Sequence, residues 1–187
     1  MSTDTLTTFF ALLALGCAAG AVLGIVLLLG AKVSGPDSTM RVARDAVGDV
    51  ALWLGWVVAL VTTLGSLYFS LVADYKPCEL CWYQRICMYP LAAILLVGAL
   101  RRDRTVWWYA GPPAAIGIVI AAYHTQLQAF PEQKTFCDLE NPCTNRYVWE
   151  FGFMSLPLMN LIALTFIVVM LVLSAQSSPR SEEIEPS

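Results

Sequence analysis

Long apolar segments recur along this chain, and they constrain its fold more than any other feature. A transmembrane helix needs about 20 predominantly apolar residues. The chain is 58% hydrophobic and 13% charged, against about 45–50% and about 25% in soluble domains. We therefore predict an all-α membrane protein, a four-helix transmembrane bundle with one additional N-terminal transmembrane helix. The five segments that carry this prediction are Phe9–Ala31, Val50–Ala73, Ile86–Leu100 with its backward extension Leu80–Gln84, Thr105–Tyr123 and Met154–Ser174.

The first apolar segment is predicted to be a retained helix and not a cleaved signal peptide. Its leading sequence MSTDTLTT carries no positive charge, and its 23 apolar residues exceed a typical signal core. Gly16, Gly20 and Gly24 recur at four-residue spacing, which puts them on one helix face and lets another helix approach closely. Glycine is also simply common in membrane helices, so close packing is one of two interpretations.

Positive charge is spread unevenly over the connecting segments, and the cytoplasmic side of a membrane protein carries the excess. Alternation of the helices predicts that the N-terminus and both cysteine-containing loops lie outside, with an acidic tail, 176–187, in the cytoplasm. No basic block is present, and nothing indicates nucleic-acid binding. The seven positive residues assigned to the inner side are Lys32, Arg41, Arg44, Arg101, Arg102, Arg104 and Arg180, and the four on the outer side are Lys76, Arg85, Lys134 and Arg146.

Four of the six cysteines fall on the predicted outer side, where disulfides form and persist. Cys17 and Cys87 fall within apolar helices, where a free cysteine behaves as a small buried hydrophobe. The cysteines expected to carry chemistry are Cys78, Cys81, Cys137 and Cys143.

The sequence PCELCWYQR, residues 77–85, places two cysteines at the start of a helix. Pro77 suits a first turn, because its missing N–H costs nothing there. Unpaired backbone N–H groups and the helix dipole stabilise a thiolate at such a position, and a thiolate of low pKa leaves well. Arg85 follows Cys81 by four residues and so shares its helix face. It could hold a thiolate or the oxygen of a reduced carbonyl compound, or it could extend toward lipid headgroups.

The second cysteine pair encloses Asp-Leu-Glu-Asn-Pro, a composition typical of a flexible loop. A disulfide between Cys137 and Cys143 is feasible, and we expect it to be exposed and reachable by another protein. It could instead be a passive structural staple. The four outer cysteines could also form a tetrathiolate zinc site, although five residues separate the second pair and the compartment favours oxidation.

Two dithiol pairs beside a membrane suggest a relay whose final electron acceptor dissolves in the lipid. A lipid quinone fits, because it takes two electrons and two protons. His124, the only histidine, should lie at the outer end of the fourth helix. Its imidazole could bond a quinone oxygen, or it could face headgroups.

Two motifs resemble the bacterial disulfide-bond-formation protein B family, especially its short-loop members, the Bdb proteins of Gram-positive bacteria. They are PCELCWYQR followed by a transmembrane run, and CDLENPC followed by an aromatic segment and SLPLMNL. The resemblance covers about residues 48–175 and implies a four-helix thiol oxidase core there. The additional helix within residues 1–34 departs from the best-known members, and so does the separation of only six residues between the loop cysteines.

The resemblance implies an enzyme that reoxidises an extracytoplasmic thioredoxin-fold partner and passes the electrons to a lipid quinone, menaquinone or ubiquinone. The partner would attack Cys137, Cys143 would then exchange with Cys78, and Cys81 would face the quinone. We predict a protein-dithiol:quinone oxidoreductase of the bacterial cytoplasmic membrane. The alternatives are a zinc-binding membrane protein and a non-catalytic scaffold with structural disulfides. The residues that the resemblance implies for the quinone pocket are Arg85, His124 and Gln128.

Overall fold

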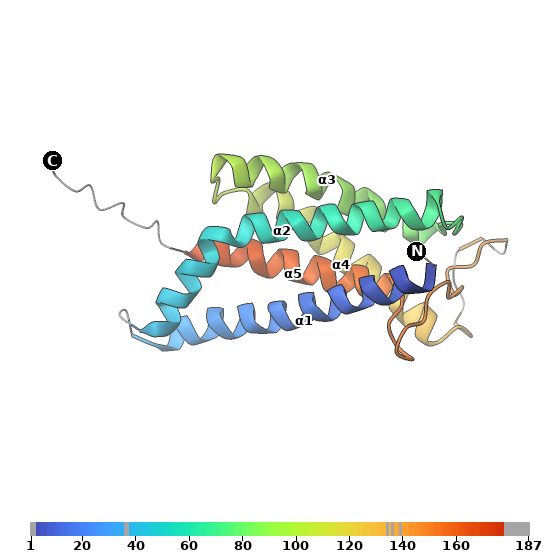
Figure 1. The fold of residues 1–187 in the computed structure, drawn as a ribbon, viewed down its shortest axis with the longest axis horizontal. Helices are drawn as coiled ribbons and strands as arrows, with labels where there is room; N and C mark the ends of the chain where they lie inside the picture. The colour runs from blue at the N-terminus through green and yellow to red at the C-terminus, as the bar shows by residue number, and fades with distance from the viewer. Residues whose placement is uncertain (1–2, 36–37, 134, 136, 139, 178–187) are drawn as a thin grey trace.

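The computed structural model describes residues 3–35, 38–133, 135, 137–138 and 140–177. Within them the chain is helical, and the only pairing of strand type is an isolated bridge between Glu150 and Met154. The prediction of an all-α protein with five helices is confirmed. The helices run along one long axis (Figure 1). They are α1 (Thr3–Val33), α2 (Thr39–Leu71), α3 (Glu79–Arg101), α4 (Trp107–Ala129) and α5 (Leu156–Gln176).

Four helices in the described part of the chain are long and apolar enough to cross a membrane: α1, α2, α3 and α5. The remaining helix, α4, has 23 residues but carries several polar side chains in its last turns. Two of these, His124 and Gln128, are buried in the protein. The polar turns of α4 therefore face protein groups that can bond to them, which a membrane bundle requires of polar residues.

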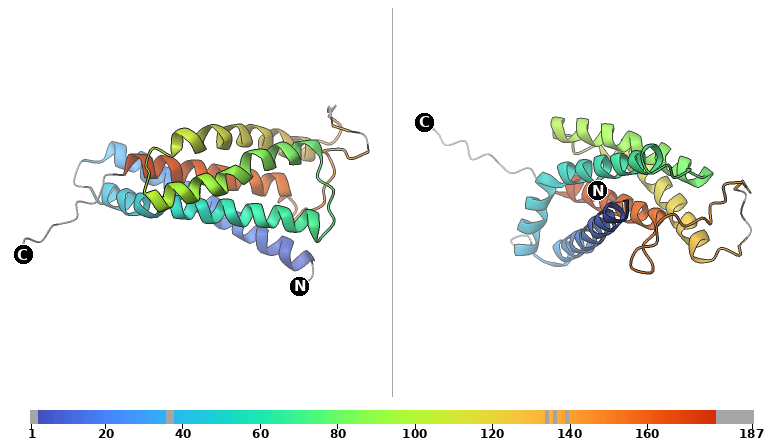
Figure 2. Two further views of the ribbon diagram at one scale, coloured as in Figure 1. Left: turned by 90° about the horizontal axis from the view of Figure 1, so that it is seen from above. Right: turned by 45° about the vertical axis from the view of Figure 1, so that its right-hand side comes forward.

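Helix α5 lies at the centre of the bundle because it is apolar on every side. It has no charged residue and packs against α1, α2 and α4, while α3 lies between α2 and α4 (Figures 1 and 2). A helix that is hydrophobic all round is expected to be buried. The largest core cluster joins α2 to α5 through residues that include Leu52, Met88, Leu91, Leu95, Leu164 and Ile167.

The two ends of the bundle differ in the connections they carry. We call one the cysteine end: it holds the start of α1, the α2–α3 connection (residues 72–78) and the α4–α5 connection (130–155) (Figure 2). The opposite end holds the α1–α2 and α3–α4 connections and the end of α5. The connections that the sequence analysis placed on one side of the membrane therefore lie together at one end of the bundle. Residues 178–187, most of the predicted acidic tail, lie outside the described residues.

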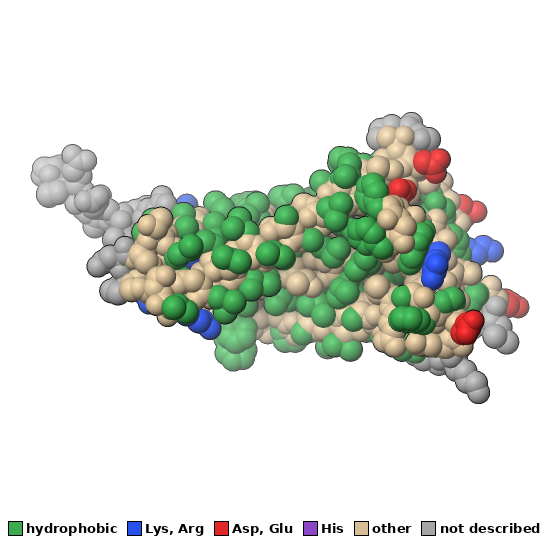
Figure 3. Space-filling model, turned by 90° about the horizontal axis from the view of Figure 1, so that it is seen from below, with side chains coloured by type: hydrophobic (Ala, Val, Ile, Leu, Met, Phe, Trp, Pro, Cys, Tyr) green, Lys and Arg blue, Asp and Glu red, His purple; other side chains and the backbone are tan. Residues whose placement is uncertain are grey.

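The surface between the two ends is largely apolar. Figure 3 shows hydrophobic side chains distributed along the body of the molecule, with acidic and basic side chains gathered toward its ends. Large apolar side chains such as Val22, Leu29, Ile86 and Val119 are more than half exposed. A soluble monomer rarely presents so much apolar surface, whereas a lipid bilayer covers it.

Helix α1 packs closely on α5 at two of its three spaced glycines. A Cβ added at Gly20 would lie 2.8 Å from the ring of Phe166, and one at Gly24 would lie 2.5 Å from a methyl carbon of Val169. A Cβ added at Gly16 would meet no atom of the described residues of other elements within 4 Å. The packing interpretation therefore holds for Gly20 and Gly24, and Gly16 does not take part.

Replacing Gly24 with leucine should weaken the docking of α1, because the new side chain has no space against Val169. Overpacking of this kind costs about 1–3 kcal/mol. Gly16→Leu is the matched control, since it adds the same side chain to the same helix where nothing is near. Thermal unfolding in detergent should give a lower midpoint for Gly24→Leu only. Equal midpoints for the two variants would contradict the packing described here.

Candidate redox site

The first cysteine pair lies at the beginning of α3, as predicted. Cys78 is the N-cap residue, with extended backbone dihedrals directly after Pro77, and its carbonyl accepts the Trp82 N–H at 3.1 Å. Cys81 follows in the first turn. The two sulfur atoms are 3.0 Å apart, and both cysteines are free thiols. The spacing of three residues at a helix start therefore brings the two sulfurs into direct contact.

The surroundings of Cys78 stabilise its thiolate. The Cys81 thiol 3.0 Å away, acting as a donor, lowers the pKa of Cys78 most, and His124 lowers it further, although burial opposes both. The His124 Nε2 atom lies 3.7 Å from the Cys78 sulfur. Cys78 is therefore suited to act both as an attacking thiolate and as a leaving group.

A chain of buried hydrogen bonds fixes the orientation of His124. The Asn160 amide donates to Gln84 Oε1 at 2.7 Å, and Gln84 Nε2 lies 2.8 Å from His124 Nδ1. His124 Nε2 lies 3.0 Å from the carbonyl oxygen of Cys143. Since that carbonyl can only accept, Nε2 carries the proton and Nδ1 accepts from Gln84. One imidazole N–H thus lies within reach of both cysteine pairs.

The second cysteine pair forms a disulfide. We expected this disulfide to be exposed, but it is buried. The Cys137–Cys143 bond is 2.02 Å long, and the two residues are 6% and 1% exposed. Both belong to a small apolar cluster that includes Cys78, Leu80 and Leu127. The expectation of an exposed pair was wrong because the loop folds back over the start of α3.

Several polar contacts hold this loop in place. The Asn141 amide donates to the Pro77 carbonyl at 3.0 Å, directly before Cys78. The Gln128 amide donates to the Asn145 carbonyl at 2.7 Å, and Arg146 donates to the Gln128 carbonyl. Gln128 lines a small cavity of about 30 Å³ beneath the loop, together with Cys78 and His124. Its visible contacts are therefore with the loop.

Arg85 is directed at α2. It donates to the Ser66 hydroxyl at 3.0 Å, the Ser66 carbonyl at 3.1 Å and the Ser70 hydroxyl at 2.9 Å. Its guanidinium carbon lies 5.2 Å from the centre of the Trp82 ring. The guanidinium is thus fixed beside Cys81 on the same helix face, as the spacing predicted, with its hydrogen bonds made across to the neighbouring helix.

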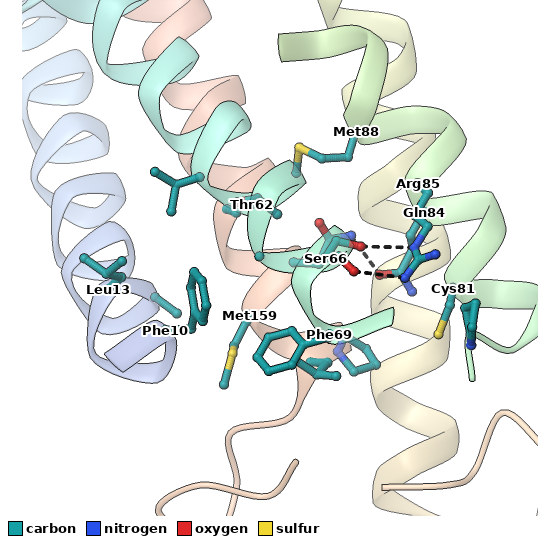
Figure 4. Close-up of a pocket in the computed structure, with 18 of the residues that line it drawn as sticks. Phe10, Leu13, Thr62, Ser66, Phe69, Cys81, Gln84, Arg85, Met88 and Met159 are labelled. Atoms are coloured by element: carbon teal, nitrogen blue, oxygen red, sulfur yellow. Dashed lines mark hydrogen bonds between the residues drawn. The ribbon is translucent and has the colours of Figure 1, made fainter. Parts of the chain in front are cut away.

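A cavity of about 240 Å³ lies between α1, α2, α3 and α5 at the level of this site. Figure 4 shows Cys81, Gln84 and Arg85 on one side and Phe10 and Leu13 of α1 on the other. Cys81 lines this cavity and Cys78 does not. The two sulfurs therefore face different surroundings: Cys78 faces the disulfide loop, and Cys81 also faces the cavity.

Most of the cavity wall is apolar, and Gln84 and Arg85 bring polar groups to the side where Cys81 lies (Figure 4). The polar side chains of the wall include Thr62, Ser66, Lys76, Gln84, Arg85, His124, Asn160 and three tyrosines, among apolar neighbours such as Val57, Val61, Met88 and Met159. Ligand sites are typically lined in this way, with few convergent polar groups on a mainly apolar wall.

The cysteines assigned to apolar helices differ from each other. Cys87 is buried, as expected of a small hydrophobe. Cys17 is half-buried and lines the large cavity from α1.

The tetrathiolate zinc arrangement is not formed, since Cys137 and Cys143 are bonded to each other. Cys78, Cys81 and His124 do bring their ligand atoms within 4.8 Å of one another. Such a set could hold a soft metal ion, but it is one ligand short of a closed structural zinc site.

Sequence reasoning missed two residues of the site, Gln84 and Asn160. Both lie within the motifs PCELCWYQR and SLPLMNL. Each is a polar side chain in an otherwise apolar helix, and such residues in membrane segments usually face the bundle interior and take part in function. That signal could have identified them.

Comparison with known proteins agrees with this geometry. The family model described as "Disulfide bond formation protein DsbB" matches residues 48–174. The chain belongs to the DsbB family. It is an oxidoreductase of disulfide bond formation and a multi-pass membrane protein. The resemblance stated from the sequence motifs is thereby confirmed.

Individual relatives support the DsbB assignment. The chain is 43% identical over 126 residues to disulfide bond formation protein C of Bacillus subtilis, which covers 66% of this chain and 91% of the relative. It is 38% identical over 141 residues to a probable disulfide formation protein of Coxiella burnetii, covering 74% of this chain and 95% of the relative. No solved structure matches the chain. Helix α1 precedes the residues that the DsbB model matches.

Proposed function

We propose that this DsbB-family protein is a dithiol:quinone oxidoreductase that reoxidises a thioredoxin-fold partner outside the cytoplasm. The observation that carries the proposal is the placement of Cys81. It lies 3.0 Å from Cys78, which faces the disulfide loop, and it also lines the large apolar cavity. One cysteine pair thus connects the loop disulfide to a site for a membrane-soluble acceptor.

The first exchange takes place at the loop. A partner thiolate attacks Cys137 and breaks the Cys137–Cys143 bond, so that Cys143 leaves as a thiolate. The partner's second thiolate then attacks the mixed disulfide and releases Cys137, which completes a two-electron oxidation of the partner. Because both loop cysteines are buried in the closed structure, the loop has to open for this attack.

The second exchange carries the two electrons to α3. The Cys143 thiolate attacks Cys78 of an oxidised Cys78–Cys81 pair, and Cys81 leaves as a thiolate. Cys137 then attacks Cys143, which restores the loop disulfide and releases Cys78. The product is a reduced helix pair beside an oxidised loop pair, which is the combination present in the structure. The N–H of His124 holds the Cys143 carbonyl and stabilises the Cys78 thiolate as it leaves.

The cavity residues fit a quinone. A bound quinone would accept two electrons and two protons and become a quinol. The apolar wall suits a lipid-soluble molecule, and Arg85 and Gln84 place N–H groups on the side of the cavity where Cys81 lies. His124 lines the same cavity, with its single N–H donated to the Cys143 carbonyl. Arg85 contributes positive charge where a carbonyl oxygen would gain electron density. Gln128 donates to the loop and lines the small cavity instead of the large one, so we assign it to holding the loop and not to contacting the quinone.

The charge pattern supports an orientation with the cysteine end outside the bacterial cytoplasmic membrane. Disulfide exchange requires that side, because the cytoplasm keeps thiols reduced. The partner would then meet the loop from the aqueous phase, while the acceptor enters from the lipid.

The proposal is tested by anaerobic turnover of the purified full-length protein, with a reduced thioredoxin-fold dithiol as donor and a ubiquinone or menaquinone analogue as acceptor. We expect one quinol for each partner disulfide formed. Absence of turnover with both quinones, in protein whose cooperative unfolding shows that it is folded, would remove the proposal. Stoichiometric zinc bound at Cys78, Cys81 and His124 in such protein would favour the metal-binding alternative.

Replacing Arg85 with methionine should lower kcat/KM for quinone by about 10²-fold, because the charge beside the acceptor oxygen is lost. Arg85→Lys keeps the charge but not the forked donor geometry, so its kcat/KM should lie between those of the wild type and Arg85→Met. Ser70→Ala is the control, since it removes one acceptor of Arg85 and leaves the guanidinium in place. Quinone titrations at saturating dithiol measure the effect. An unchanged kcat/KM in Arg85→Met would show that Arg85 only anchors α3 to α2.

A further inference from the structure

Helix α1 lies outside the DsbB match, yet it forms a wall of the large cavity. The match begins at residue 48, and α1 ends at Val33. The 126 matched residues of the Bacillus subtilis relative are 91% of its length, so about 12 of its residues remain unmatched. About 12 residues are too few to form an additional helix equivalent to α1, which has 31 residues.

The residues that α1 contributes form one helix face. They are Phe10, Leu13, Ala14 and Cys17. Figure 4 shows Phe10 and Leu13 facing the cavity. Positions separated by three and four residues lie on one side of an α-helix. Phe10 and Cys17, at its two ends, are seven residues apart, which is about 10 Å along the helix axis. It contains no group that could bond a quinone oxygen strongly, unlike the opposite wall at Arg85 and Gln84.

Three separate contacts hold this face against the cavity. Gly20 and Gly24 allow α1 to lie directly on α5. The Phe10 ring lies over Gly65 of α2, where a Cβ would come within 2.9 Å of it. Near the start of α1, the Thr7 hydroxyl donates to a carboxylate oxygen of Glu150 at 2.6 Å. Glu150 belongs to the α4–α5 connection, so α1 is fixed to the same segment that carries the disulfide loop.

A series of aromatic rings continues from α1 over the end of the cavity. Phe10 contacts Phe69 edge to face at a centroid distance of 5.6 Å, Phe69 stacks on Tyr75 at 5.6 Å, and Tyr75 stacks on Tyr147 at 4.9 Å. All four rings line the cavity. The cavity is thus bounded by these rings toward the cysteine end and extends away from them between α1 and α2.

We propose that α1 supplies the wall for the prenyl tail of the quinone, with the ring lying at Cys81 and Arg85. On this proposal, which rests on the proposed function, Leu13, Ala14 and Cys17 determine which tail the enzyme accepts. The polar end and the apolar α1 end of the cavity correspond to the polar ring and the apolar tail of one molecule. The additional helix is then a specificity element of the acceptor site.

The test compares Leu13→Trp with Leu12→Trp. Leu13 lines the cavity, whereas Leu12 does not and is 56% exposed. Two quinones with the same ring are used, one with a prenyl tail and one without. Leu13→Trp should raise KM for the tailed quinone by about tenfold, with kcat and the KM of the tail-less quinone nearly unchanged. Leu12→Trp should match wild type. An equal effect on both quinones, or no difference between the two variants, would overturn the proposal.

A binding measurement that needs no turnover accompanies the kinetics. A ligand that binds only the folded protein raises its unfolding midpoint. The tailed quinone should raise that midpoint in wild type and Leu12→Trp, and less in Leu13→Trp. If wild type binds the tailed quinone in this way but reduces none, the proposed function fails and the assignment of α1 stands. If wild type shows turnover but all three proteins are stabilised equally, the assignment of α1 fails alone. Leu13→Ala, which removes wall contacts without adding bulk, should also weaken binding of the tailed quinone, and by a smaller factor.

Discussion

Replacing Cys81 with serine is expected to lower quinone reduction by at least about 10³-fold with every electron donor. Cys81 is the cysteine of the α3 pair that lines the cavity, and loss of a residue that forms bonds during turnover removes nearly all catalysis. Cys137→Ser should be equally inactive with the thioredoxin-fold donor. It should still reduce quinone with a small dithiol, provided that the reagent reaches Cys78 without the loop disulfide.

The same assay with both donors separates the steps. Cys87→Ser is the control, because Cys87 is a buried thiol on the same helix without a role in the relay. It should retain turnover with both donors. Activity of Cys81→Ser with any donor, or full activity of Cys137→Ser with the protein donor, would show that electrons take another route.

His124→Ala should slow turnover with the protein donor by about 10²-fold, a typical cost of losing a positioned proton donor. The imidazole N–H lies 3.0 Å from the Cys143 carbonyl and 3.7 Å from the Cys78 sulfur, so its loss affects the contact between the two pairs. His124→Gln is the matched control, since its amide can return an N–H to the same region. It should recover part of the rate. Equal rates for the alanine and glutamine variants would argue against this hydrogen bond.

A pH measurement on Cys78 adds a second readout for His124. The Cys81 thiol and then His124 lower the pKa of Cys78. Removing the imidazole should therefore raise that pKa, so that the thiolate forms only at higher pH. The rate of alkylation of Cys78, mapped by mass spectrometry, should shift to higher pH in His124→Ala and less in His124→Gln. A purely structural role for His124 would leave this profile in place.

The helices were predictable from the sequence because each depends on local apolar content. The residues at which the helices begin and end were less predictable. The apolar part of the fourth segment ends at Tyr123, and the helix was predicted to continue past it through His124, as α4 does to Ala129. Its last turns contain His124 and Gln128, and their burial against protein allows a polar stretch to remain helical. Similarly, α2 begins at Thr39, eleven residues before the apolar segment starts, with Ser38 as its N-cap.

The site was predictable where it depends on spacing along one helix. The contact between Cys78 and Cys81, and the position of Arg85 on the face of Cys81, follow from separations of three and four residues. Features that depend on how separate elements pack could not be derived in this way. The burial of the loop disulfide arises from Asn141 and Gln128, which lie far from α3 in sequence. The wall formed by α1 depends on its docking at Gly20 and Gly24.

The central claim is that both cysteine pairs pass their electrons to one quinone site, and a single-turnover titration tests it most directly. The full-length protein is reduced completely, freed of reductant, and mixed anaerobically with excess quinone. Two dithiols connected to the cavity should yield two quinols per chain, and Cys137→Ser should yield one. A yield of one quinol from the wild-type protein would show that the loop pair is not connected to the cavity. A yield of none would contradict the account as a whole.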